Sequence, residues 1–109
     1  MTRDELVNFL GTLDVNLRSS QVQFFFQNRP QPDRDRFVFF RQEVTFLEGK
    51  LRNAQLASIA GKLDELSNDI GAGINQLQSE LNALNNTIAI LNTLAALLGL
   101  VARVAALAA

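Results

Sequence analysis

Three pairs of neighbouring carboxylates are the groups in this chain best suited to acid–base chemistry: Asp4 and Glu5, Asp33 and Asp35, and Asp64 and Glu65. Such catalysis needs carboxyl groups whose surroundings push their pKa values apart. Each pair lies instead beside a predicted helix start or on a polar face, where carboxylates favour the helix dipole and solvent. We therefore expect these pairs to stabilise helices rather than to catalyse a reaction.

The composition removes most other catalytic and metal-binding chemistry. The chain has no His and no Cys, so the commonest general base and the thiolate nucleophile are both absent. Lys50 and Lys62 lie in polar segments, which do not favour a catalytic amine. The run Gly71-Ala72-Gly73 lacks the remainder of a dinucleotide-binding fingerprint. The sequence predicts a protein that is not an enzyme and uses no cofactor or metal.

Charge is small in total and uneven along the chain. The formal net charge is −1, which gives no general attraction to nucleic acid, so no nucleic-acid partner is expected. Residues 1–52 hold eight of the ten basic residues and all eight Phe, whereas the tail becomes progressively aliphatic. The first residues are too polar and acidic for a cleavable signal peptide, and the location of the protein stays open.

The segment 1–32 is predicted to form a mixed-charge, Phe-rich head. Thr2 and Glu5 have the spacing of a capping box, and apolar residues follow at helical intervals, so a helix over about 3–13 is expected. Within residues 13–28, residues 13–18 alternate strictly between apolar and polar, and three consecutive Phe follow at 24–26. That stretch is compatible with a second short helix or with part of a β-hairpin.

An amphipathic helix is predicted over 33–54, after Pro30 and Pro32 end the preceding element. Its apolar residues recur at alternating steps of three and four: Phe37, Phe40, Val44, Leu47, Leu51 and Ala54. A strand over 36–47 is the alternative. The apolar phase breaks after this helix, which predicts a turn within 49–61.

The segment 55–109 carries a strict seven-residue repeat, which we call the heptad seam. Its members are Leu56, Leu63, Ile70, Leu77, Leu84, Leu91 and Leu98. A continuous helix with this seam would be about 80 Å long, far longer than a globule of this size, so it is predicted to associate with other copies. A fold-back at Gly71–Gly73 is the alternative. The expected fold class is mostly α, with long helices forming a bundle or coiled coil.

The last 29 residues, 81–109, carry Arg103 as their one charge. We expect this tail to be buried against other copies, another protein or lipid. Residues 88–109 are long enough to cross a bilayer, but they are rich in Ala and lack the Trp and Tyr typical of membrane interfaces. Burial in protein is therefore the favoured interpretation, and burial in lipid the alternative.

A polar stripe interrupts the apolar tail. Asn82, Asn85, Asn92 and Arg103 follow one another by helical steps, with small residues between them. The stripe is compatible with a solvent-facing surface, with a close helix–helix contact in which Asn sets the register, or with the lumen of a membrane assembly.

These features together predict a non-catalytic, self-assembling structural or scaffold subunit that forms a helical oligomer or filament. The alternative is an α-helical protein that inserts into membranes, as a pore-forming or lytic protein. A third hypothesis is an adaptor whose tail, residues 88–109, docks on one protein partner.

Overall fold

The computed structural model describes residues 1–108 and contains five α-helices. They are α1 (Arg3–Leu17), α2 (Ser20–Gln27), α3 (Gln31–Arg52), α4 (Leu56–Ala83) and α5 (Thr87–Ala105). The predicted mostly α class is confirmed, as a compact helical bundle. No strand occurs between residues 1 and 108, so the β-hairpin considered for the head and the strand considered over 36–47 are both wrong.

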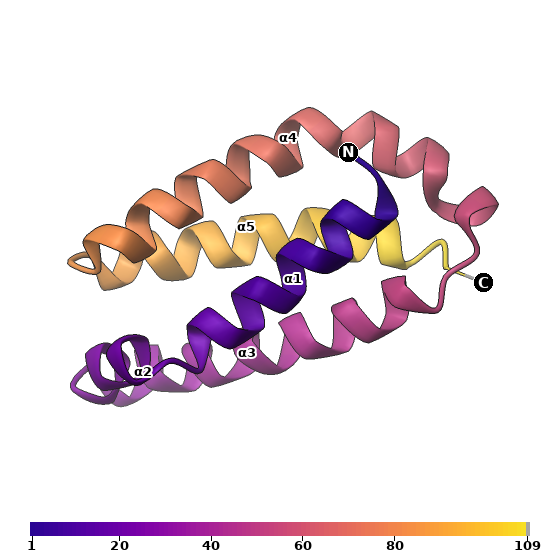
Figure 1. Cartoon of the computed structure of the whole chain (residues 1–109). Helices are drawn as coiled ribbons and strands as arrows, with labels where there is room; N and C mark the ends of the chain where they lie inside the picture. Colours follow the sequence, from indigo (N-terminus) through magenta and orange to yellow (C-terminus); the bar gives the residue numbers. More distant parts are fainter. Residues whose placement is uncertain (109) are drawn as a thin grey trace.

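The four longer helices form a bundle 43 Å long and about 20 Å across, and α2 covers one end of it (Figure 1). α4 packs along α5, α5 packs along α3, and α3 packs along α1. α2 contacts α3 and α1 at the end that also holds the turn between α4 and α5. α5 thus lies between α3 and α4.

Local signals in the head set where the first helices begin. The hydroxyl of Thr2 accepts a hydrogen bond from the Glu5 amide (3.1 Å), and the Glu5 carboxylate accepts one from the Thr2 amide (2.9 Å). Hydrogen bonding from the backbone and side chain of Thr2 favours the ionised carboxylate and lowers the pKa of Glu5. Ser19 caps α2 in the same way, through the amide of Val22. Local hydrogen bonds therefore begin both helices.

The uninterrupted helix expected over 55–109 is wrong. α4 ends at Ala83, and the chain reverses over residues 84–86 before α5 begins. Leu84 takes a left-handed conformation (φ 48°, ψ 49°), and its amide donates to the carbonyl of Glu80. The side chain of Asn86 then caps α5 by accepting from the amide of Ala89 (3.0 Å). The alternative fold-back at Gly71–Gly73 is also wrong, because that segment is helical within α4.

The helical hairpin made by α4 and α5 buries much of the apolar tail within the chain itself. Nine of the 19 residues of α5 are buried within the chain itself. The expectation that residues 81–109 must be buried against other copies, another protein or lipid therefore does not hold for the inner side of α5, which is buried within the chain. α3 and α4 cover the apolar side of α5, and only its outer side is exposed.

A disulfide tests the hairpin directly, since the natural chain has no Cys. A Cβ at Gly73 would lie 3.6 Å from the Cβ of Leu97, within the range of about 3.5–4.5 Å that disulfides span. We expect the Gly73→Cys, Leu97→Cys variant to form an intramolecular disulfide on mild oxidation, detected by mass spectrometry after thiol alkylation.

The matched control is Gly71→Cys with Leu97→Cys, because a Cβ at Gly71 would have no neighbour within 4 Å. This control should keep its thiols free. In one continuous helix, residues 73 and 97 would be about 36 Å apart. Free thiols or only intermolecular cross-links in the first variant would contradict the hairpin.

Candidate functional site

The heptad seam belongs to the core of the single chain. Five of its seven members are buried between the helices: Leu63, Ile70, Leu77, Leu91 and Leu98. Leu56 is exposed at the first turn of α4, and Leu84 is partly buried in the turn before α5. The structure therefore does not present the seam as a surface for association.

The polar stripe lies on the surface but not in one place. Asn82 and Asn85 are exposed at the turn between α4 and α5. Asn92 is exposed near the start of α5, and Arg103 is exposed in its last turn, where a cation favours the helix dipole. The four residues thus face solvent in the single chain, and only Asn92 and Arg103 share the outer face of α5.

The exposed residues of α5 form one continuous surface, which we call the α5 stripe. Its members, five in α5 and one at its C-cap, follow one another by steps of three or four residues: Ile88, Asn92, Ala96, Gly99, Arg103 and Ala106. The side chains in the middle of the stripe are small, at Ala96 and Gly99. The space outside Gly99 is open, since a Cβ there would meet nothing within 4 Å. Two large apolar side chains mark its ends, because Ile88 is 54% exposed and Leu107, just after α5, is 46% exposed.

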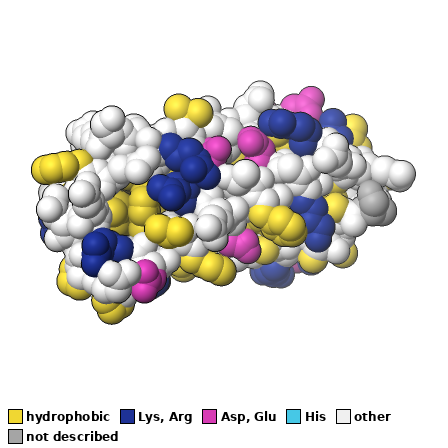
Figure 2. Space-filling model, turned by 90° about the horizontal axis from the view of Figure 1, so that it is seen from below, with side chains coloured by type: hydrophobic (Ala, Val, Ile, Leu, Met, Phe, Trp, Pro, Cys, Tyr) yellow, Lys and Arg dark blue, Asp and Glu magenta, His cyan; other side chains and the backbone are white. Residues whose placement is uncertain are grey.

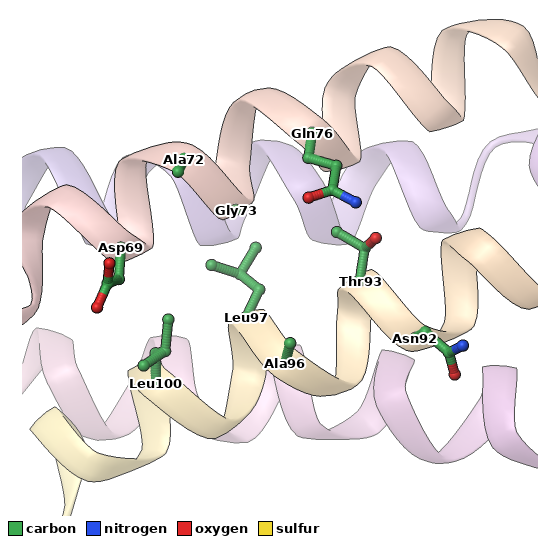
Figure 3. Close-up of a pocket in the computed structure, with 9 residues that line it drawn as sticks. All are labelled: Asp69, Ala72, Gly73, Gln76, Asn92, Thr93, Ala96, Leu97 and Leu100. Carbon is green, nitrogen blue, oxygen red and sulfur yellow. The ribbon is translucent and has the colours of Figure 1, made fainter.

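A shallow groove of about 340 Å³ runs beside the α5 stripe, between α4 and α5 (Figure 3). Leu97 points from α5 toward Gly73 on α4, and a Cβ at Gly73 would lie 3.1 Å from the Cδ1 of Leu97. Gly73 therefore allows the two helices to approach closely. Asp69 and Gln76 line the groove from α4, with Asn92 and Ala96 opposite them on α5. Asn92 and Ala96 thus belong to both surfaces.

The carboxylate pairs considered for acid–base chemistry make local contacts. Glu5 is part of the helix cap described above. Glu65 accepts a hydrogen bond from the amine of Lys62 (2.9 Å), and this contact lowers the pKa of Glu65. Asp35 accepts a hydrogen bond from the side chain of Gln31. Glu5, Glu65 and Asp35 thus support helix ends and helix surfaces, as their positions in the sequence suggested.

Two arginines at the other end of the molecule were not predicted from the sequence as binding residues. The run Asp33-Arg34-Asp35-Arg36 looks self-paired, yet none of its four residues forms an ion pair within the described chain. Arg34 instead lines a pocket with Arg41, one heptad further along α3. Two Arg seven residues apart on a helix, with Phe37 between them, were the available signal. The pocket that these two arginines line also needs α2, and the sequence left the conformation of residues 13–28 undecided.

No protein-family model, curated protein or solved structure matches this chain.

Proposed function

We propose that this chain is a non-catalytic structural subunit that assembles with copies of itself through the α5 stripe. The observation that carries the proposal is the exposed face of α5, where the small residues Ala96 and Gly99 lie one helical turn apart between exposed Ile88 and Leu107. Small residues at such spacing let two helix backbones approach closely. This assembly differs from the one expected through the heptad seam, whose residues are used inside the chain.

The order of residues along the stripe favours an antiparallel pair of α5 helices. If the two-fold axis passes between Ala96 and Gly99, each Ala96 faces Gly99 of the second copy. Asn92 then faces Arg103 of the second copy, whose guanidinium can donate to the Asn92 amide oxygen. Ile88 faces Leu107, so the two exposed apolar residues of each chain become buried together, at about 25 cal/mol per Å² of apolar area. The stripe is thus self-complementary, as a two-fold interface requires.

Growth beyond a dimer needs a second surface, since a two-fold contact closes on itself. Phe39 and Phe46 lie one heptad apart on α3 and are 57% and 61% exposed. Figure 2 shows hydrophobic side chains reaching the surface on the side of the molecule that carries α3. Exposed aromatic side chains of this size favour burial against another molecule. This second surface supports the proposal of a larger oligomer or filament.

A glycine substitution tests the α5 stripe without disturbing the single chain. We expect the wild-type protein to sediment as a dimer or larger species at micromolar concentration without detergent. Gly99→Gln should sediment as a monomer, because its side chain fills the space that a second helix would occupy. Gly61→Gln is the control, since Gly61 is also exposed on a helix with nothing near its Cβ. A monomeric wild-type protein, or equal effects of both variants, would contradict the proposal.

A charge substitution tests the antiparallel direction. Asn92 and Arg103 lie about 16 Å apart along one helix, so they cannot pair within a chain. In the antiparallel dimer, Asn92→Glu would face Arg103 of the second copy, and we expect a lower dissociation constant that rises with salt concentration. A parallel dimer would place two Glu side chains together and weaken association. Asn75→Glu on the exposed side of α4 is the charge-matched control and should change little.

Membrane insertion is the second candidate function, and the composition of α5 is what favours it. α5 is the one helix in the described chain that is long and apolar enough to cross a bilayer, with a mean hydropathy of 2.0 over 18 residues. Half of that window is buried inside the bundle, as it would also be in the core helix of a soluble protein. Insertion would therefore require α5 to leave its contacts with α3 and α4.

The same disulfide that tests the hairpin separates the two candidates. The bond formed in the Gly73→Cys, Leu97→Cys variant would hold α5 against α4 and prevent the bundle from opening between them. If the protein acts on membranes, the reduced variant should release dye from liposomes and the oxidised variant should release much less. If the chain is a structural subunit, neither form should release dye. Equal release by both forms would contradict insertion through an opened hairpin.

A further inference from the structure

A pocket of about 270 Å³ lies between α2 and α3, at the end of the bundle away from the start of α4. Its walls come from two helices that the turn at residues 28–30 brings together. Gln27 lines it from α2, while Arg34, Val38 and Arg41 line it from α3. Within this pocket, cationic side chains thus lie around an apolar surface.

The floor of the pocket is aromatic and firmly packed. Phe26 of α2 and Phe37 of α3 stack with their ring centroids 4.2 Å apart and an interplanar angle of 8°. Both side chains are buried in the core cluster, so the floor is held in place from below. Val38 adds an aliphatic edge beside the rings. The floor therefore suits a flat or compact apolar group.

The two arginines of the pocket lack acidic partners. Neither Arg34 nor Arg41 belongs to any of the ion pairs formed by residues 1–108. The Nε of each is shielded from solvent and has no hydrogen-bond acceptor. Arg34 donates through Nη2 to the side chain of Gln31, and the guanidinium of Arg41 lies 5.6 Å from the Phe37 ring centroid. Buried donors without an acceptor are unfavourable, so an acceptor in this pocket would stabilise it.

The lining of the pocket is positive, because Arg34 and Arg41 are the only charged residues among those that line it. Asp35, on the same helix but outside the lining, accepts a hydrogen bond from the side chain amide of Gln31. Arg36 lies outside the lining, with its guanidinium 5.6 Å from the Phe40 ring centroid. On the face seen in Figure 2, basic side chains lie beside hydrophobic ones toward the end that carries α2. The combination favours a ligand that is both anionic and apolar.

We propose that this pocket binds an organic oxyanion, a phosphate or carboxylate joined to a small apolar group. The guanidinium groups of Arg34 and Arg41 would donate to the oxyanion, for which their planar fork is well suited. The apolar group would contact Val38, which is 39% exposed beside the buried Phe26–Phe37 pair and which a bare inorganic anion would leave in water. The oxyanion could belong to a free phosphate monoester or to the headgroup of an anionic lipid, which present the same chemistry.

The test uses phenyl phosphate as the probe and the full chain labelled with ¹⁵N for amide NMR. Phenyl phosphate at millimolar concentration should shift amides of α2 and α3 around the pocket, and inorganic phosphate should bind more weakly. Arg34→Gln and Arg41→Gln should each raise the dissociation constant about tenfold or more, since charged hydrogen bonds are lost. Absence of phenyl phosphate binding to the wild-type protein would overturn the proposal.

The matched control is Arg36→Gln, which removes the same charge from the same helix outside the pocket lining. It should change the dissociation constant little, and equal weakening by all three variants would indicate diffuse attraction and overturn the proposal. Arg34→Lys and Arg41→Lys keep the charge but lose the fork, so they should bind phenyl phosphate more weakly than the wild type while remaining folded. Wild-type affinity in both Lys variants would also count against the pocket.

Vesicles distinguish the two sources of the oxyanion. Phosphatidic acid vesicles that bind the wild-type protein but not the Arg34→Gln variant, with phosphatidylcholine vesicles as the blank, would assign the site to a lipid headgroup. Binding of phenyl phosphate without vesicle binding would assign it to a soluble ligand. Vesicle binding that persists in Arg34→Gln and Arg41→Gln, without phenyl phosphate binding, would overturn the proposed pocket.

Discussion

The close packing of α4 on α5 is the contact on which the remainder of the structure depends. Gly73 offers no side chain where Leu97 approaches, so the two helices can lie together along their length. That contact holds α5 in the middle of the bundle, where its other side meets α3. α1 packs along α3, and the apolar residues of α1, α3, α4 and α5 form one core. Without the α4–α5 contact, the most apolar helix of the chain would lie open to water.

The position of α5 also divides its residues between two roles. Leu91 and Leu98 on its inner side belong to the core. Ala96 and Gly99 on its outer side are small and exposed, and the proposed pairing of two α5 helices uses this outer side and none of the core positions. Self-assembly therefore keeps the bundle intact, whereas membrane insertion would break the contacts of α5 with α3 and α4. The two candidate functions require different states of the same helix, and this difference makes them separable by experiment.

The end of the bundle that holds α2 has a different chemistry from the α5 stripe. Its cations lie against aromatic rings rather than against carboxylates, with the Arg29 guanidinium 4.5 Å from the Phe25 ring centroid. Contacts of this kind stabilise a cation but leave its hydrogen-bond donors free for an acceptor. The small-residue surface and the basic, aromatic surface therefore suit different partners: a helix of a second copy and a small organic anion.

The helical class, the cap at Thr2 and Glu5, and the turn between α3 and α4 could be predicted from the sequence, because each depends on neighbouring residues. It did not determine whether Leu77 and Leu91 lie on one long helix or on two antiparallel ones, since both arrangements show the same seven-residue repeat. Leu84 has no local preference for its left-handed conformation, which costs about 1–2 kcal/mol. Only the burial of α5 against α4 offsets that cost. The reversal of the chain therefore depends on tertiary contacts between α4 and α5. The same contacts determine which residues stay exposed for binding.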